Sequence, residues 1–166
     1  MYFILIGILL ILDQLTKFWA ASTFPLNGQG QAIGLGFYFT YVRNTGAAFG
    51  IFQEGTFPLA ILSTVVSLAL FLFLLLRAKT LPVVQRYAIA SILAGAIGNM
   101  IDRFRLQYVV DFIHFKLPNF DFPVFNVADS CVVVGAALLI LSSLFTPKQP
   151  QERTSLNETE FFKRIE

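Results

Sequence analysis

Apolar and polar residues occur along the chain in long blocks. Four of these blocks are mostly apolar and have the length of membrane-spanning α-helices, although the third is short for the roughly 30 Å hydrocarbon core of a bilayer. They cover residues 2–22, 56–76, 87–104 and 126–146. The regions between them, 23–55 and 105–125, are richer in polar and turn-forming residues. The pattern predicts a membrane protein, mainly α, with four transmembrane helices.

Two shorter stretches in the polar regions have the composition of β-strands. Phe37–Val42 is a run of aromatic and β-branched residues, and residues 106–115 return to alternation. In the second stretch, alternation places Asp111 on one face of a strand and His114 on the other. An open sheet edge is not tolerated in contact with lipid, so we expect a small sheet outside the bilayer.

The first apolar block contains two charged residues, Asp13 and Lys17, in its second half. A cleavable signal peptide would instead have a basic start and an uncharged apolar core. We therefore expect a retained transmembrane helix. The acid lies one helical turn before the lysine, a spacing that favours a stabilising ion pair.

The third apolar block is short and rich in small residues. Ala90, Ala94 and Gly98 recur every four residues, and one further step reaches Asp102. Small residues at this spacing let membrane helices approach closely. The spacing predicts a close-packed seam that leads to a polar cluster.

Basic residues predict the orientation in the membrane. The connection between the second and third apolar blocks carries Arg77, Lys79 and Arg86 without an acid, as short cytoplasmic loops do. With four spans, both termini are then cytoplasmic, including a polar tail at 147–166. We treat residues 1–146 as one membrane domain, with extracytoplasmic regions at 23–55 and 105–125.

The composition agrees with a membrane protein and excludes some functions. The chain is 56% hydrophobic and 13% charged, with a net charge of +2, so it lacks the basic surface that nucleic acids require. His114 is the only histidine and Cys131 the only cysteine. A two-histidine zinc site and an intramolecular disulfide are therefore excluded within one chain.

Polar residues gather near the outer ends of the predicted helices, where they must pair with one another or line a wet cavity. They are Asp13, Lys17, Asn99, Asp102, Arg103, Asn126 and Asp129, joined from the outer regions by Asn44 and Asp111. Two carboxylates brought together there can share one proton. Asp111 and Asp129 could therefore activate a water, one taking its proton while the other polarises a scissile carbonyl.

Some of these residues also have plainer interpretations. Asn126 and Asp129 are spaced as the N-cap and third residue of the last helix. Asp111 could be an ordinary exposed strand residue. For Asp102 and Arg103, an ion-pair network that holds the helix ends together is the favoured interpretation. Asn44 and Asn126 are equally suited to fixing turns and to donating hydrogen bonds to the acids or to a substrate backbone.

Five sequence blocks carry a more specific signal because they occur together and in order. They are Asp13-Gln-Leu-Thr-Lys17, Arg43-Asn-Thr-Gly-Ala-Ala-Phe49, Gly98-Asn-Met-Ile-Asp-Arg103, Val109-Val-Asp-Phe112 and Phe125-Asn-Val-Ala-Asp129. In these blocks the chain resembles the bacterial lipoprotein signal peptidases, or type II signal peptidases. The resemblance covers everything except the tail after Pro147. One departure is Gln107, where the family often has a glycine, which affects a turn rather than the acids.

The resemblance implies a multi-pass aspartyl endopeptidase of the bacterial cytoplasmic (inner) membrane. It implies cleavage of prolipoproteins just before a cysteine that already carries diacylglycerol, at a site near the extracytoplasmic face. Asp111 and Asp129 match the catalytic aspartates, and Asp102 matches in a structural role. The residues that match in binding substrate or shaping the site are Asp13, Lys17, Asn44, Gly46, Asn99, Arg103 and Asn126.

The resemblance also implies four helices, an extracytoplasmic β-cradle and a short helical flap. We expect Phe37–Tyr41 and Gly46–Gly50 to form walls that receive peptide and lipid. The expected partners are diacylglyceryl-prolipoproteins and membrane lipids, with no metal, no organic cofactor and no nucleic acid. We expect a monomer.

Two other classes make different predictions. A proton-coupled transporter predicts acids at the midplane and repeated, broken helices, whereas here the acids cluster at one end and no repeat is visible. A purely structural scaffold predicts that neutralising both acids changes only stability.

Overall fold

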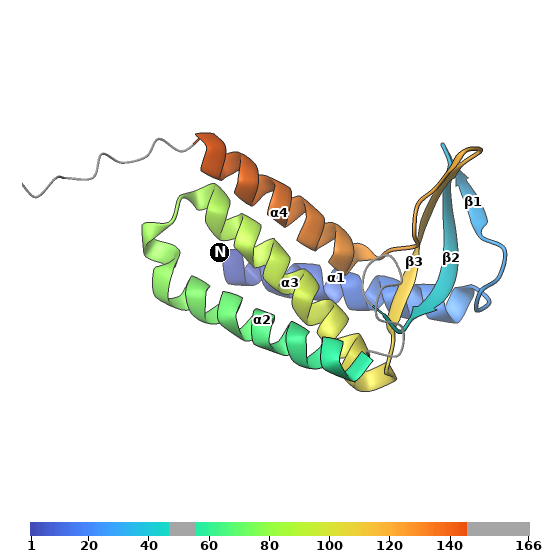
Figure 1. Cartoon of the computed structure of the whole chain (residues 1–166), viewed down its shortest axis with the longest axis horizontal. Coiled ribbons are helices and arrows are strands. Elements are labelled where there is room, and N and C mark those ends of the chain that lie inside the picture. The colour runs from blue at the N-terminus through green and yellow to red at the C-terminus, as the bar shows by residue number, and fades with distance from the viewer. Residues whose placement is uncertain (47–55, 146–166) are drawn as a thin grey trace, which may run out of the picture.

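The computed structural model describes residues 1–46 and 56–145. Along the chain, helices and strands follow one another in the order shown in Figure 1. They are α1 Tyr2–Thr23, β1 Gln31–Gly34, β2 Phe37–Asn44, α2 Thr56–Arg77, the short 3-10 helix η2 Ala78–Thr80, α3 Val83–Leu106, β3 Val109–Leu117, β4 Phe120–Asp121 and α4 Val127–Phe145. The predicted fold class, mainly α with a small sheet, is confirmed.

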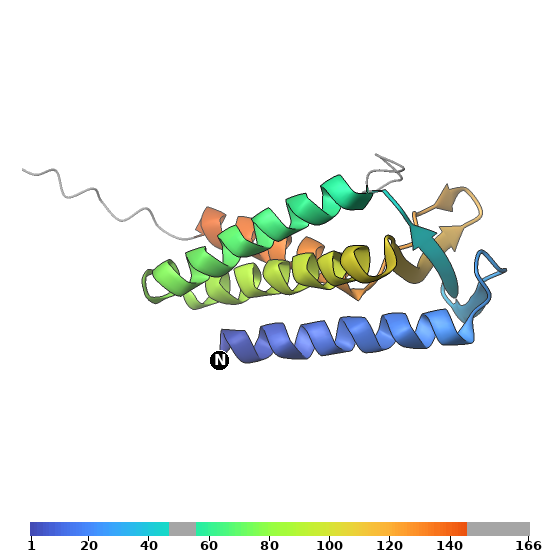
Figure 2. The ribbon, with the colours of Figure 1, turned by 90° about the horizontal axis from the view of Figure 1, so that it is seen from below.

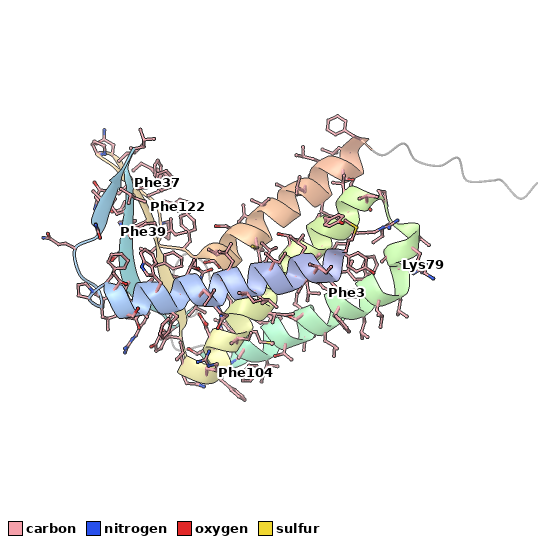
Figure 3. The ribbon with its side chains drawn as sticks, turned by 180° about the vertical axis from the view of Figure 1, so that it is seen from behind. Phe3, Phe37, Phe39, Lys79, Phe104 and Phe122 are labelled. Carbon is pink, nitrogen blue, oxygen red and sulfur yellow. The ribbon has the colours of Figure 1, made fainter. Side chains whose placement is uncertain are left out.

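The four long helices run alternately up and down, and the sheet lies at one end of their bundle (Figure 1). The N-terminus and the α2–α3 connection lie at the other end. Figure 3 shows the same separation, with Phe37 and Phe39 on the sheet, Phe122 just after β4, and Lys79 at the opposite end. The described parts of regions 23–55 and 105–125 therefore lie at the end that carries the sheet, and the basic connection lies away from it.

α3 is the central helix of the bundle. It packs against α1, α2 and α4, and in Figure 2 it runs between α1 and α2. Among the described residues, Tyr2–Thr23, Thr56–Thr80 and Val127–Phe145 are long and apolar enough to cross a membrane. α3 is less apolar than these helices, which is possible because its three neighbours shield it from lipid. It begins at Val83, directly after Pro82, rather than at the predicted residue 87.

Small residues set the distances between α3 and its neighbours. Ala90 and Ala94 are buried, as the predicted seam requires, and a Cβ on Gly98 would lie 2.5 Å from Asp13 Oδ2 of α1. A second seam, not predicted, joins α3 to α4. There a Cβ on Gly95 would overlap the carbonyl oxygen of Ala128. Close helix approach therefore extends to the residues beside Asp129.

The sheet is antiparallel, with the strand order β1-β2-β3-β4. A bulge interrupts the β2–β3 pairing, because Phe39 pairs with Ile113 but Val42 pairs with Asp111. Beyond the bulge Asn44 pairs with Val109, which places Asn44 diagonally across from Asp111. The bulge thus fixes which β2 side chain meets the β3 acid.

Trp19, near the end of α1, anchors the sheet to the bundle. Its ring makes edge contacts with Phe24 and Phe39, each with ring centroids 5.1 Å apart, and with Phe112 at 6.3 Å. Such edge-to-face pairs favour a fixed geometry. The anchored sheet therefore holds β3 in place over the ends of the helices.

The turn after α3 explains the family's glycine at position 107. Gln107 is the C-cap of α3 in the left-handed region, with φ 65° and ψ 18°, and its N–H donates to the carbonyl oxygen of Arg103. Glycine adopts this conformation without steric cost. The turn that the family makes with glycine is thus made here by Gln107.

The sequence did not predict the short strands β1 and β4 individually. The described residues between α1 and α2, and those between α3 and α4, contain no further helix. Residues 47–55 lie outside the described residues, so the short helical flap stays a prediction.

Candidate functional site

A cavity of about 820 Å³ lies where the sheet meets the ends of α3 and α4. Six predicted site residues line it: Asn44, Gly46, Asn99, Arg103, Asp111 and Asp129. The apolar part of its lining is formed mainly by Phe122–Phe125 before α4 and by Val132–Val134 on α4. The structure therefore brings the two acids to one cavity.

One expected wall is in the wrong place. Phe37–Tyr41 does not line this cavity; Val42–Gly46, the segment that follows it, does. The reason is the direction of β2: its aromatic start packs on Trp19 of α1 through Phe39, and its end lies at the cavity beside α3 and α4. Gly46 lies in the wall as expected, and residues 47–50 fall outside the part of the chain that the structure describes.

Asp111 is buried in β3, with 2% of its surface exposed. Each carboxylate oxygen accepts a side-chain amide hydrogen bond, from Asn44 Nδ2 at 2.9 Å and from Asn126 Nδ2 at 2.7 Å. Burial, and then the negative charge of Asp129, raise the pKa of Asp111 to about 7, although both hydrogen bonds act in the opposite direction. Asp111 can therefore hold a proton near neutral pH.

Asp129 lies in the first turn of α4 and is more exposed than Asp111. It forms a reciprocal cap with Asn126: the Asp129 N–H donates to Asn126 Oδ1 at 2.9 Å, and the Asn126 N–H donates to Asp129 Oδ2 at 3.1 Å. The helix-cap interpretation is therefore correct. The other oxygen, Oδ1, accepts a hydrogen bond from Asn99 Nδ2 at 2.8 Å, and Asp129 also lines the cavity. The Asp129 side chain therefore both caps α4 and lines the cavity.

Asn126 links the two acids from behind the cavity wall. It is fully buried. Its side chain donates to Asp111 and accepts the Asp129 N–H, and its backbone N–H donates to Asp129 Oδ2. Its amide also contacts Asn99 Oδ1 at 3.2 Å and the Val110 carbonyl oxygen at 3.3 Å. A buried amide with this many partners holds one orientation.

Three further predicted residues lie beneath the cavity without lining it. Lys17 Nζ is 3.0 Å from Asp13 Oδ2 and 3.0 Å from Asp102 Oδ2, and all three side chains are buried. Asp13 Oδ1 accepts the Ala128 N–H, and Asp102 Oδ2 accepts the Val110 N–H. The predicted Asp13–Lys17 ion pair is present. The network ties α1 to the start of α4 and α3 to β3.

Arg103 lines the cavity from α3, and its position differs from the favoured interpretation. Asp102 joins the ion-pair network, whereas Arg103 donates to the carbonyl oxygens of Asn99 at 3.4 Å and Gly46 at 3.3 Å. It thus braces the loop after β2 against α3. Its cationic group faces the same cavity as the two acids.

Sequence reasoning missed two contributors. Gln14 Nε2 lies within hydrogen-bond distance of Asp13, Asp102 and the Gly98 carbonyl oxygen; its place inside the Asp13-Gln-Leu-Thr-Lys17 block was the signal for it. Arg43, at the cavity rim, stacks on Tyr108 with its guanidinium carbon 4.7 Å from the ring centroid. A tyrosine directly before the Val109 block offered no signal for this contact.

Other titratable groups lie away from the acids. His114 Nε2 is 2.6 Å from Asp121 Oδ1 on the β3–β4 hairpin, and His114 does not line the cavity of the two acids. Within residues 1–46 and 56–145 there is no group of three or more histidine, cysteine or acidic side chains that could hold a metal ion. The predicted absence of a metal stays a prediction.

The fold and the cavity define a multi-pass membrane protein with two carboxylates at one end of a helical bundle. A solved structure described as a bacterial membrane enzyme superposes on it with a TM-score of 0.80 and 33% identity, covering 91% of this chain and 93% of that one. A second structure with the same description gives 0.77, also at 33% identity, covering 88% and 94%.

The family model described as signal peptidase (SPase) II matches residues 5–145. The lipoprotein signal peptidase of Gloeothece citriformis is 45% identical over 87% of this chain and 88% of its own length. That of Clostridium tetani is 42% identical over 85% and 90%, and that of Bacillus pumilus 38% over 93% and 99%. The chain belongs to the signal peptidase II family, and it is a multi-pass peptidase of the inner membrane.

Proposed function

We propose that this chain removes signal peptides from diacylglyceryl-modified prolipoproteins, cutting before the lipidated cysteine with Asp111 and Asp129 as the catalytic pair. One observation carries the proposal: two acids from different elements face one cavity, and Asn126 holds both. The sequence blocks shared with the family include both acids. The names of the relatives, lipoprotein signal peptidases, support the class of substrate.

The two acids have different environments, which assigns their roles. Asp111 is buried and has its pKa raised to about 7, so it carries the proton. Asp129 is more exposed than Asp111 and lines the cavity from the first turn of α4, where it can take the proton of a water. Asp129 is therefore the base, and Asp111 the acid.

The reaction then needs one water and the peptide bond. Asp129 takes a proton from the water as its oxygen attacks the scissile carbonyl carbon, and the Asp111 proton stabilises the charge that develops on the carbonyl oxygen. The resulting tetrahedral intermediate collapses when the C–N bond breaks. The proton held by Asp129 passes to the leaving amine, which is the new N-terminus at the lipidated cysteine.

The apolar wall suits a lipidated substrate. Val132 to Val134 line the cavity, and Val133 and Val134 are largely exposed on the outer surface of α4. The cavity therefore borders the surface of the bundle that faces the acyl chains of the membrane. Diacylglycerol chains lie along this wall while the peptide reaches the acids.

The orientation follows from the charges at the other end of the bundle. Arg77, Lys79 and Arg86 lie at or near the α2–α3 connection, away from the sheet. By the positive-inside rule this end is cytoplasmic. The cavity then faces the extracytoplasmic side, and both termini are in the cytoplasm.

The substrate class is tested with one prolipoprotein prepared with and without diacylglycerol on its cysteine. We expect cleavage of the lipidated form only, and mass spectrometry should find the lipidated cysteine at the new N-terminus. Removing the acyl chains forfeits about 0.8 kcal/mol for each buried CH₂ group, which is enough to make the unmodified form a very poor substrate. Equal cleavage of both forms, or cleavage elsewhere, would contradict the proposal.

A further inference from the structure

We propose that Lys17 is a positioning residue for the peptidase reaction, because it fixes the direction of a hydrogen-bond chain that reaches both acids through Asn99 and Asn126. The proposal rests on the proposed function of the Asp111–Asp129 pair. Lys17 does not line the cavity. It acts through the residues between itself and the acids.

The first step of the chain is the contact between Lys17 and Asn99. Lys17 Nζ lies 2.8 Å from Asn99 Oδ1. An ammonium group only donates hydrogen bonds, so it can meet the oxygen of the amide but not its nitrogen. With the oxygen held at Lys17, Asn99 Nδ2 must point the other way. It does so, and donates to Asp129 Oδ1 at 2.8 Å.

The second step is the contact between Asn126 and Asp129. The Asp129 backbone N–H donates to Asn126 Oδ1 at 2.9 Å, which again leaves only the amide nitrogen for the remaining partners. Asn126 Nδ2 donates to Asp111 Oδ1 at 2.7 Å and lies 3.2 Å from Asn99 Oδ1. The same Asn99 oxygen thus accepts from both Lys17 and Asn126. If the Asn99 amide were reversed, its nitrogen would face the donors of Lys17 and Asn126, and its oxygen would face the Asp129 carboxylate.

Lys17 itself is held firmly in this position. Its side chain is 3% exposed, and its three N–H bonds have three acceptors: Asp13 and Asp102 at 3.0 Å each, and Asn99 at 2.8 Å. Asp13 and Asp102 together place two carboxylates against one ammonium group. The two carboxylates take up two of its N–H bonds and leave the third for Asn99.

Two consequences follow for the reaction. Asn99 presents a donor, rather than an acceptor, to Asp129, and so holds the carboxyl group of the base in one position. The positive charge of Lys17 also acts on Asp111. The other charged groups around the acids are Asp13 on α1, Asp102 and Arg103 on α3, and Arg43 on the rim from β2.

The test is Lys17→Met, which keeps most of the apolar stem and removes the donor. We expect kcat/KM for the lipidated prolipoprotein to fall by about 10- to 100-fold, the range for one charge-assisted hydrogen bond. The alkaline limb of its pH profile should move to higher pH, because Asp111 loses a nearby positive charge. A folded Lys17→Met enzyme with the wild-type rate and alkaline limb would overturn the proposal.

A matched control is Gln14→Leu, which disturbs the same buried acids without touching Asn99. We expect it to lower the thermal unfolding temperature and to leave the pH profile in place. A purely structural role for Lys17 predicts the same behaviour for Lys17→Met, so the two variants separate the interpretations.

If Lys17→Met does not fold, the Asn99→Asp variant tests the proposal in its place. Aspartate keeps an oxygen for Lys17 but presents an oxygen, rather than an N–H donor, to Asp129. The proposal predicts a loss of at least about 10-fold and a displaced alkaline limb; wild-type values would overturn it. Asp129→Asn is measured in the same experiment to keep the two proposals distinct. Full activity of Asp129→Asn would contradict the proposed function, not the role of Lys17.

Discussion

Asp111→Asn and Asp129→Asn are each expected to lower kcat for cleavage of a diacylglyceryl-modified prolipoprotein by about 10²- to 10⁴-fold, the range for a general acid or base. Asparagine cannot accept the proton of the attacking water at position 129. At position 111 it cannot pass a proton to the carbonyl oxygen. The two side chains have nearly the size of the acids, so the cavity keeps its shape.

Thermal unfolding in detergent should show that both variants remain folded. Asp121→Asn is the matched control, because Asp121 is an exposed acid on the β3–β4 hairpin that pairs with His114 and Lys116. We expect its kcat to stay within about twofold of wild type, as for most surface substitutions. Cleavage at the wild-type rate by either cavity variant would rule out the catalytic pair.

Gly95→Ala is expected to damage both the fold and the reaction. A Cβ at this position overlaps the carbonyl oxygen of Ala128 and would lie 2.8 Å from Val132 Cγ2, so α3 and α4 must separate. Overpacking of this kind costs about 1–3 kcal/mol. Ala128 immediately precedes Asp129, and its N–H is held by Asp13. The shift therefore reaches the base as well, and we expect kcat to fall together with the thermal unfolding temperature.

Gly7→Ala is the matched control for this prediction. Gly7 is also a helical glycine, but no atom lies within 4 Å of the Cβ that it would gain. Alanine is the better helix former, so this variant should be as stable as wild type or slightly more stable, with unchanged cleavage. Equal effects of the two substitutions would contradict the close approach of α3 and α4.

The apolar blocks predicted the helices well, because crossing a bilayer demands long runs that few other structures need. The small-residue spacing of Ala90, Ala94 and Gly98 predicted a seam because small side chains at this spacing let helices approach closely. The bulge in β2 could not be predicted, since neither strand alone records which residues of the other it will face. The direction of Asn44 toward Asp111 depends on that bulge.

Individual acids were easier to find than their connections. Asp13 and Lys17 are one helical turn apart, so their ion pair could be predicted from local spacing. The contact of Lys17 with Asn99 joins residues 82 positions apart, and it depends on how α1 and α3 pack. Asp129 was given two competing interpretations, helix cap and cavity acid. The structure shows one carboxylate with an oxygen in the cap and a place in the cavity wall.

The pH dependence of kcat/KM tests most directly the claim that the two acids work with one proton, because this ratio reports the free enzyme. The pKa of Asp111 is raised from its ordinary value of 3.8 to about 7, so folding favours its protonated form between these values. As pH rises through about 7, Asp111 loses the proton that the reaction needs.

Measured on the lipidated prolipoprotein from pH 5 to 9, kcat/KM should therefore fall on the alkaline side, with a midpoint near pH 7. Histidines titrate in the same range, so His114→Gln serves as the control and should keep this limb. A midpoint near 7 that persists in His114→Gln is the predicted result. A ratio that stays constant or rises up to pH 9 would contradict the one-proton aspartyl pair.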